Sequence, residues 1–218
     1  NTDNHPFGKV TTNTVLVLTT GHILLGTDMG LFRYEPNSSS LIHLSLGKIG
    51  IQFILQATNG TIWVIARDPL GHGLLYSFED GKWRPHLADK SITTIYQSPD
   101  NHLWAGAERG LYLFDEKQGW RQKLTLTAKV NCIYQLADGT MLAGTDSGLW
   151  IQQISEESDL TTTQLGLFIE GIFQASNGII WCRSDQGVLS YDGQSWTNHL
   201  VNPSLSSITG FRSGIHEA

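Results

Sequence analysis

The chain has 218 residues and a formal net charge of -6. Only 16% of its residues are charged, against roughly 25% in an average domain, and the sequence has no cluster of Lys and Arg. These properties argue against a nucleic-acid-binding protein, which usually presents a basic face. No apolar run approaches the roughly 18 residues needed to cross a bilayer, so we expect no membrane insertion of this segment.

Short runs rich in Ile, Leu, Trp, Tyr and Phe recur along the whole chain, separated by turn-forming residues. In the clearest stretch, residues 92–124, four such runs predict four antiparallel strands, named a to d, at 94–97, 103–105, 111–114 and 120–124. The residue in the turn between strands a and b recurs as Gly21, Gly60, Asn101, Gly139 and Gly178. The glycine that opens strand c recurs as Gly30, Gly73, Gly110, Gly148 and Gly187. Both markers keep one period of about 40 residues, which predicts an all-β propeller because each small sheet can bury its faces only against neighbouring sheets.

The predicted blades extend, in chain order, over residues 10–45, 49–87, 91–124, 128–165 and 168–200, with a partial sixth blade at 204–218. At the two ends, residues 5–10 resemble an isolated strand d and residues 206–214 an isolated strand a. We therefore predict a single propeller domain over residues 1–218, built from four-stranded antiparallel blades. Two arrangements remain open: five blades that close with irregular ends, or part of a larger ring, which we favour.

The repeat is carried best by Trp104-Ala-Gly106 with Gly110-Leu-Tyr-Leu-Phe-Asp115, and by Gly144-Thr-Asp-Ser-Gly-Leu149. It resembles the two-component regulator propeller repeat, found in the sensor regions of bacterial hybrid histidine kinases. The resemblance covers most of the chain. It implies a non-enzymatic sensing or protein-interaction module of a signal-transduction protein, in a periplasmic or extracellular location. Because the chain has only five recognisable blades and no kinase segment, the role in signal transduction rests on the resemblance.

An acidic residue recurs in the turn between strands b and c. Successive strands reverse direction, so the b–c turns and the links between blades are expected on one face of the propeller. That face would collect Asp28, Asp68, Glu108, Asp146 and Asp185. One interpretation is a ring of carboxylates that attracts cations or a basic partner. The alternative, which the recurrence favours, is that Asp is a good turn residue because it accepts hydrogen bonds from backbone amides.

The residue just before the strand-c glycine changes chemistry in every blade: Met29, His72, Arg109, Ser147 and Gln186. Variable residues on a repeated scaffold are typical of a binding surface. We therefore take these five as candidate ligand-binding residues, together with the links at Lys48, Lys90, Lys129 and 168–170; the alternative is exposed turn positions that are free to vary. His72, in the longest b–c turn, is the histidine that we single out as a ligand contact; the alternative, which its place in a loop favours, is a solvated histidine.

The aromatic and sulfur-containing residues favour packing roles. Trp63, Trp104 and Trp181 share one place in strand b, and Trp83, Trp120 and Trp196 share one place in strand d. Repeated places predict packing between blades rather than a platform for sugars. Trp150 lies outside both sets; a contact between blades is favoured for it, and an aromatic that faces a sugar is the alternative. Cys132 and Cys182 lie in predicted strands, which favours buried free thiols over a disulfide.

Three classes of function are compatible with the sequence. A sensing or protein-interaction propeller is preferred, because the sequence contains no recognised catalytic motif and no metal-ligand spacing of cysteines, so we predict neither a cofactor nor a metal. A carbohydrate-binding propeller is the first alternative. A propeller enzyme with loop-borne catalytic residues is the second, and it would need His72, Asp68 and Glu108 in one cleft. The partner is therefore expected to be a small molecule, an oligosaccharide or a protein.

Overall fold

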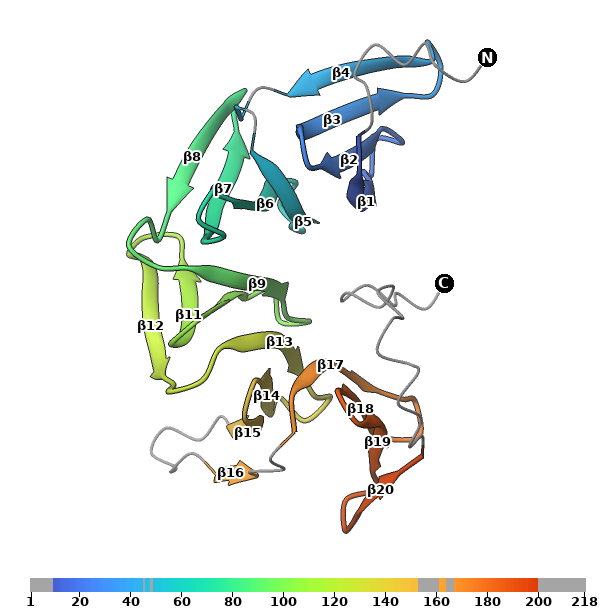
Figure 1. The fold of residues 1–218 in the computed structure, drawn as a ribbon, viewed down its shortest axis with the longest axis vertical. Helices are drawn as coiled ribbons and strands as arrows, with labels where there is room; N and C mark the ends of the chain where they lie inside the picture. The colour runs from blue at the N-terminus through green and yellow to red at the C-terminus, as the bar shows by residue number, and fades with distance from the viewer. Residues whose placement is uncertain (1–9, 45, 48, 153–160, 164–166, 200–218) are drawn as a thin grey trace. The chain divides into compact units, whose positions relative to one another are not determined.

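The described part of the structure is built entirely from small antiparallel sheets. The structure is a computed structural model that describes residues 10–44, 46–47, 49–152, 161–163 and 167–199, with the backbone alone for 161–163. Within these residues, strands β1 to β20 form five four-stranded antiparallel sheets, and neighbouring strands of each sheet follow one another in the chain (Figure 1). The predicted all-β class and the four-stranded repeat are therefore confirmed.

The strands of each sheet, in the order a to d, have the following bounds. The first sheet is β1 (Thr12–Val17), β2 (Ile23–Thr27), β3 (Gly30–Glu35) and β4 (Ser40–Leu44), and the second is β5 (Gly50–Gln56), β6 (Ile62–Arg67), β7 (Gly73–Glu79) and β8 (Lys82–His86). The third is β9 (Ile92–Gln97), β10 (Leu103–Ala107), β11 (Gly110–Asp115) and β12 (Gly119–Thr125), and the fourth is β13 (Val130–Gln135), β14 (Met141–Thr145), β15 (Gly148–Gln152) and β16 (Thr161–Thr163). The fifth is β17 (Ile169–Gln174), β18 (Ile180–Ser184), β19 (Gly187–Tyr191) and β20 (Trp196–Asn198). The predicted end strand within residues 5–10 and the partial blade at 204–218 lie outside the described residues, apart from Val10.

The chain divides into two compact units. The first, Asn1–Ile92, contains the first two sheets, and the second, Thr93–Ala218, contains the other three, with β9 beginning at the last residue of the first unit. Each unit is described below by itself. Whether all the sheets belong to one propeller domain stays a prediction.

In the first unit, the core lies between the first and second sheets. Leu24 and Leu31 of the first sheet are fully buried, as are Ile51, Val64 and Ala66 of the second. Burying an aliphatic side chain of this size contributes about 1.5–3 kcal/mol, so this contact is a main source of the unit's stability. The contact buries only one face of the first sheet, since Val15 and Val17 of β1 remain 58% and 64% exposed.

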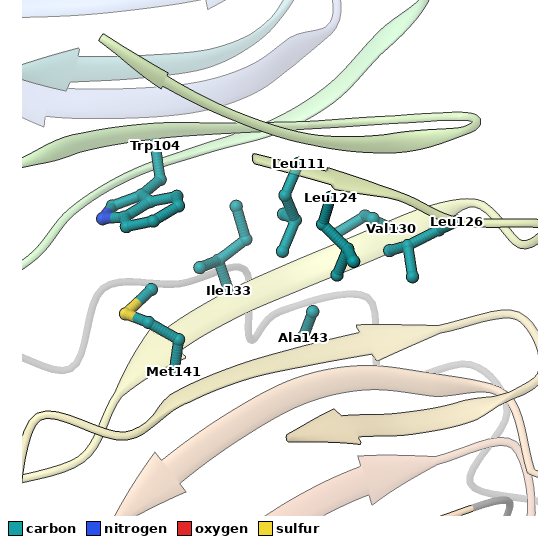
Figure 2. Close-up of a cluster of buried hydrophobic side chains, with 8 residues drawn as sticks. All are labelled: Trp104, Leu111, Leu124, Leu126, Val130, Ile133, Met141 and Ala143. Atoms are coloured by element: carbon teal, nitrogen blue, oxygen red, sulfur yellow. The ribbon is translucent and has the colours of Figure 1, made fainter. Parts of the chain in front are cut away.

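In the second unit, the fourth sheet buries both of its faces. One face packs against the third sheet in a cluster formed by Trp104, Leu111, Leu124, Leu126, Val130, Ile133, Met141 and Ala143 (Figure 2). The other face packs against the fifth sheet through Cys132, Leu142, Leu149, Ile169, Ile180, Cys182 and Leu189. Neighbours such as Leu142 and Ala143 thus point to opposite faces, which explains why the apolar residues of this strand form a continuous run.

Three sheet-to-sheet junctions use the same close approach. A Cβ atom added at Gly26, Gly106 or Gly144 in strand b would lie 2.8, 2.7 or 2.6 Å from a methyl group of the strand a that packs on it. Those methyl groups belong to Ile51, Val130 and Ile169, respectively. Because real Cβ atoms are not found so close, glycine is required at these three places. The register of the second sheet places Ile65 at the corresponding position.

The same junctions carry a side-chain hydrogen bond to the next sheet. Asn13 Nδ2 donates to the Ile51 carbonyl at 3.0 Å, Asn131 Nδ2 donates to the Ile169 carbonyl at 3.1 Å, and the Thr93 hydroxyl donates to the Val130 carbonyl. Asn13 and Asn131 lie where the register of β1 and β13 shifts at a β-bulge. The bulge re-aims each side chain toward the neighbouring sheet, so that packing and hydrogen bonding act together.

Packing between sheets, as the repeated places predict, is seen for Trp104, Trp83 and Trp196, which belong to or pack against clusters that join two sheets. Trp181 is only partly buried. Trp63 and Trp104 are only 2% and 9% exposed. In strand d, Trp83, Trp120 and Trp196 lie directly opposite Phe78, Phe114 and Tyr191, with ring centroids 4.8, 5.2 and 5.0 Å apart. Trp150 packs against the cluster that joins the third and fourth sheets. Cys132 and Cys182 are buried and free, as predicted.

Candidate functional site

The b–c turns, which carry the candidate binding residues, have a backbone fixed by hydrogen bonds in three sheets. The hydroxyl groups of Thr27, Thr145 and Ser184, each at the end of strand b, accept the amide hydrogens of Met29, Ser147 and Gln186 at 3.1–3.2 Å. The same hydroxyl groups donate to the carbonyls of Gly30, Gly148 and Gly187 at 2.8, 2.9 and 3.1 Å. The backbone frame is thus constant, while the side chain before the glycine is exposed and variable.

Three of the recurrent acids join their b–c turn to the link that precedes strand a. The amides of Asp28, Asp146 and Asp185 donate to the carbonyls of Thr11, Lys129 and Phe168, each at 3.1 Å. The Oδ1 atoms of Asp28 and Asp185 accept the amide hydrogens of Thr11 and Phe168 at 3.0 and 3.2 Å. Asp146 Oδ1 instead accepts from Asn131 Nδ2 at 2.9 Å. These bonds are of the kind that the turn interpretation expects, because the carboxylates take up backbone and side-chain donors of their own sheet.

The second sheet has a longer turn, in which Asp68 holds His72. Oδ1 of Asp68 accepts the amide hydrogens of Leu70 at 2.9 Å and His72 at 2.8 Å, and Oδ2 lies 3.1 Å from Nδ1 of His72. Desolvation would raise the pKa of Asp68, but the hydrogen bonds from His72 and Leu70 outweigh it and lower that pKa. The carboxylate therefore orients the imidazole and leaves Nε2 of His72 directed away from this contact.

The same turn presents an apolar side chain to solvent. The guanidinium of Arg67 donates to the Gly71 carbonyl at 2.8 Å, and the Gly71 amide donates to the Asp68 carbonyl at 2.9 Å. Between these bonds, Leu70 is 81% exposed. A rigid loop that exposes a large apolar group loses little conformational entropy on binding, which suits contact with a ligand or partner.

The structure places the five candidate residues in two separately described units. Met29 and His72 belong to the first unit, and Arg109, Ser147 and Gln186 belong to the second; all five are exposed at the same position of their turns. Asp68 and His72 are brought together, whereas Glu108, an exposed residue of the third sheet, belongs to the other unit. Lys48 lies outside the described residues. Within the described ranges, no group of three His, Cys, Asp or Glu side chains could hold a metal ion.

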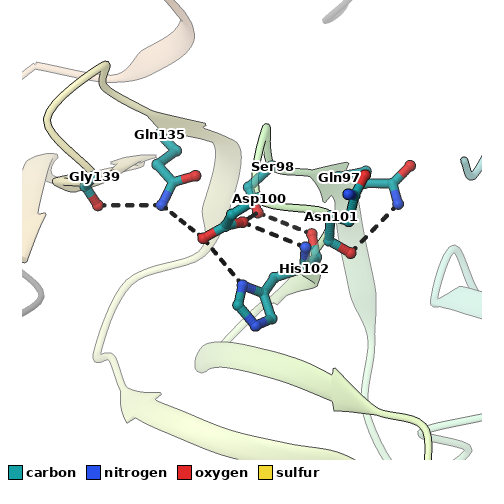
Figure 3. Close-up of polar contacts among 7 residues, drawn as sticks. All are labelled: Gln97, Ser98, Asp100, Asn101, His102, Gln135 and Gly139. Atoms are coloured by element: carbon teal, nitrogen blue, oxygen red, sulfur yellow. Dashed lines mark hydrogen bonds and ion pairs between the residues drawn. The ribbon is translucent and has the colours of Figure 1, made fainter.

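A polar cluster in the a–b turn of the third sheet was not expected from the sequence (Figure 3). Oδ2 of Asp100 lies 3.0 Å from Nδ1 of His102 and accepts from Gln135 Nε2 of β13 at 3.3 Å, and the Ser98 hydroxyl donates to Oδ1. Burial would raise the pKa of Asp100, but the hydrogen bonds from Ser98, His102 and Gln135 hold it well below its usual range. Ser98 bonds to the carboxylate rather than to the imidazole, so these three residues do not form a nucleophilic triad. The cluster instead joins the third sheet to the fourth.

The sequence predicts only the local turn bond of this cluster and not its contact with the next sheet. Asn59, Asp138 and Asn177 occupy the place of Asp100 in other sheets, and each accepts the amide hydrogen of the residue two positions later, at 2.9–3.2 Å. This repeated turn bond follows from the residue type. The contact with Gln135 joins residues 35 positions apart, and no local pattern marks it.

No protein-family model and no curated protein matches the sequence. Among solved structures, the chain is similar to an extracellular domain described as that of a hybrid two-component system, BT4673, from B. thetaiotaomicron, with 20% identity and a TM-score of 0.63 over 79% of this chain and 26% of that chain. It is also similar to YCF48 bound to D1 peptide, with 15% identity and a TM-score of 0.61 over 87% of this chain and 66% of that chain. A third similar structure is XC5397 from Xanthomonas campestris, described as a gluconolactonase, with 11% identity and a TM-score of 0.54 over 79% and 69% of the two chains.

These similarities show a β-propeller fold, and the extracellular sensor domains among them agree with the resemblance of the repeat. The chain spans about a quarter of the length of the first two of these domains, 26% and 27%. In the part of the chain that the structure describes, no helix is long and apolar enough to cross a bilayer.

Proposed function

We propose that this chain is a non-enzymatic propeller module that senses a ligand or binds a protein through its b–c turns, as the sensor part of a signal-transduction protein. The observation that carries the proposal is the contrast within these turns. Hydrogen bonds of Thr27, Thr145 and Ser184 keep the backbone constant, while the exposed residue before the glycine differs in every sheet. A constant frame with variable exposed side chains is how a repeat scaffold builds a specific surface.

The similar structures support the kind of function and the location. Extracellular domains of hybrid two-component systems support a sensing role outside the cytoplasmic membrane, periplasmic or extracellular. The propeller described as bound to a peptide supports binding of a protein segment as one form of this role. Because this chain spans only part of the sensor domains, its ligand and its attached signalling partner are part of the proposal.

The test is a thermal-shift screen of the chain against a panel of amino acids, linear peptides and neutral and acidic oligosaccharides. A compound that raises the melting temperature is then tested on His72→Ala, Arg109→Ala and Gln186→Ala. We expect at least one of these variants to lose the shift, and we expect the matched control Ser176→Ala, in the exposed a–b turn of the fifth sheet, to keep it. A shift that survives all three substitutions but is lost in the control would place binding on the opposite turns and contradict the proposal.

An enzyme is the second candidate, favoured by one contact. Asp68 orients His72 through Nδ1 at 3.1 Å, which is how a carboxylate prepares an imidazole to act as a general base. Because similar propellers include a described gluconolactonase, gluconolactone is tested separately from the binding panel, and its hydrolysis is followed by acid release. We expect no turnover; hydrolysis that His72→Ala abolishes would support the enzyme instead.

A further inference from the structure

The b–c turn of the second sheet carries an insertion that the other four sheets lack. In those sheets, two residues separate strand b from strand c, an acid and the variable residue, whereas residues 68–72 separate β6 from β7. Asp68 and His72 occupy the two regular places. The insertion is therefore Pro69-Leu70-Gly71.

The projecting turn, residues 68–72, is held by hydrogen bonds and stands away from the sheet. The Gly71 amide donates to the Asp68 carbonyl at 2.9 Å, which closes a β-turn with Pro69 at its second place. At the base, the Asp68 amide donates to the His72 carbonyl at 3.1 Å. Residues 69–72 are all exposed, and a Cβ added at Gly71 would meet nothing within 4 Å. The turn is thus an ordered projection into solvent.

The tip of the projecting turn is apolar, and so is the neighbouring turn. Leu70 is 81% exposed, more than any other large hydrophobic side chain of the described residues, and Met29 in the b–c turn of the first sheet is 38% exposed. The two turns lie close in the backbone. A Cβ added at Gly50 would lie 3.8 Å from the Asp28 Cα, and Gly50 pairs with Arg67 in the register of the second sheet. One edge of the first unit therefore exposes two apolar side chains from adjacent turns.

The polar groups beside Leu70 leave a cation as the main charged contact. Both carboxylate oxygens of Asp68 are bonded within the turn, to the amides of Leu70 and His72 and to Nδ1 of His72. Arg67 is exposed, and its bond to the Gly71 carbonyl uses one of the five N–H groups of a guanidinium. A carboxylate is the group that complements the guanidinium best.

The link that follows β8 adds no net charge beside the projecting turn. The Gly73 amide donates to Oγ of Ser91 at 3.2 Å, which brings this link against the base of the turn. There, Asp89 and Lys90 form an ion pair at 2.8 Å. The acidic and basic side chains of the turn and the link therefore balance, although the chain as a whole has a net charge of -6.

We propose that the projecting turn anchors this module to a protein partner by inserting Leu70 into an apolar pocket of that partner, with a carboxylate at the rim of the pocket paired to Arg67. The inference rests on the proposed function, because it places the partner on one of the b–c turns. An apolar tip that enters a pocket and is ringed by polar contacts is the arrangement of a binding hot spot, and an ordered turn loses little entropy there. Met29 adds a flexible second contact.

A protein pocket fits the projecting turn better than a small molecule or a lipid surface does. A small molecule needs a concave site that surrounds it, and here the apolar group projects into solvent. A lipid surface needs more apolar area, because even one myristoyl chain binds membranes only marginally, and the net charge of -6 opposes an anionic leaflet. A pocket, by contrast, encloses a single leucine and excludes water from the contacts around it.

The test uses a displayed library of repeat-protein domains with a randomised concave surface, selected on the 218-residue chain without counter-selection, so that the binders find the preferred surface by themselves. Their affinities are measured by isothermal titration calorimetry. We expect most independent binders to carry Asp or Glu at randomised positions and to lose affinity about tenfold or more in Leu70→Ser. The matched control is Val17→Ser, which removes a 64% exposed aliphatic side chain from β1 of the same unit and should leave the affinity unchanged. Equal melting temperatures of both variants and the unchanged chain show that folding is preserved.

The inference is overturned if most binders keep their affinity in Leu70→Ser or lose as much in Val17→Ser. Binders that depend instead on Arg109→Ala or Gln186→Ala contradict this inference alone and leave the proposed function intact. The proposed function is contradicted by a different result, a thermal shift that survives all three b–c turn variants and is lost in Ser176→Ala. A lipid surface is tested by sedimentation with vesicles of phosphatidylcholine, with and without phosphatidylserine. Vesicle binding that Leu70→Ser abolishes would assign the tip to a membrane and overturn the protein partner.

Discussion

The Asp68 carboxylate lies 3.1 Å from Nδ1 of His72 and also accepts the His72 amide hydrogen at 2.8 Å, so that one residue fixes both the backbone and the ring of the other. Hydrogen bonding of this kind stabilises the ionised carboxylate, and the pKa of Asp68 is lowered although desolvation alone would raise it. The contact is local to the turn, because the two residues are four positions apart.

We therefore expect His72→Ala to raise the pKa of Asp68 toward that of a free aspartate. Because the folded pKa is the lower one, this contact adds stability above the unfolded pKa and loses it as the pH falls through the folded pKa. The measurement is an NMR titration of the Asp68 side-chain carbon in both proteins. An unchanged titration would mean that the Leu70 and His72 amides alone set the pKa.

The polar cluster of Asp100 should contribute to stability near neutral pH. Gln135→Ala removes the donor that joins β13 to the a–b turn of the third sheet, at a cost of about 1 kcal/mol, the usual size of a net hydrogen bond.

Asp100→Asn should weaken the acid dependence of unfolding, because the pKa of this carboxyl is low in the folded chain and its stabilisation is lost as the pH falls. Urea unfolding at several pH values between neutral and strongly acidic measures both effects. Parallel pH curves for Asp100→Asn and the unchanged chain would contradict the second expectation.

Gly144→Ala should destabilise the second unit. The added Cβ would lie 2.5 Å from Cys132 Sγ and 2.6 Å from an Ile169 methyl group, so the fourth and fifth sheets must separate slightly, at a cost of about 1–3 kcal/mol. The matched control is Gly171→Ala, whose Cβ meets only the Arg183 Cβ at 3.8 Å and should change the unfolding free energy by less than about 1 kcal/mol. Urea unfolding followed by tryptophan fluorescence compares the two. Equal effects would contradict the close-approach argument.

The buried thiols should be unreactive in the folded chain. Burial raises the pKa of Cys132 to about 12 and that of Cys182 also to about 12, so both stay protonated and shielded. We expect a coloured disulfide reagent at pH 8 to label them only as fast as the chain unfolds. Rapid labelling of either thiol without unfolding would show that its sheet opens locally.

The same thiols predict a loss of stability in alkali. Between their unfolded pKa, near 9, and the folded value of about 12, the unfolded chain binds fewer protons than the folded chain, so the unfolding free energy falls as the pH rises. Cys132→Ala should reduce this slope. Thermal unfolding from pH 8 to pH 11 provides the measurement, and an unchanged slope in the variant would assign the alkaline effect to other groups.

The repeat and its local contacts were predictable from the sequence alone. The turn markers, including Gly139 and Asn101, predicted four-stranded sheets with nearly correct strand positions. The structure adds that Asn101 has a positive φ of 67°. The recurrence of Trp104 and Trp63 predicted burial, and the recurrence of Asp28 favoured a turn role. These features depend on alternation, turn chemistry and spacing, which are properties of residues close together in the chain.

The tertiary structure decided which residues meet across sheets. The Asn131 side chain reaches the Ile169 carbonyl, Gln135 reaches Asp100, and Gly144 is required by a methyl group of the next sheet. The difference between Gly144 and Arg183 is visible when the repeats are aligned, but only the packed structure shows that Gly144 lies against Ile169 and that Arg183 pairs with Glu170. The contacts between sheets join residues 25 to 40 positions apart, and their energy depends on which faces pack together, which no local pattern of side chains encodes.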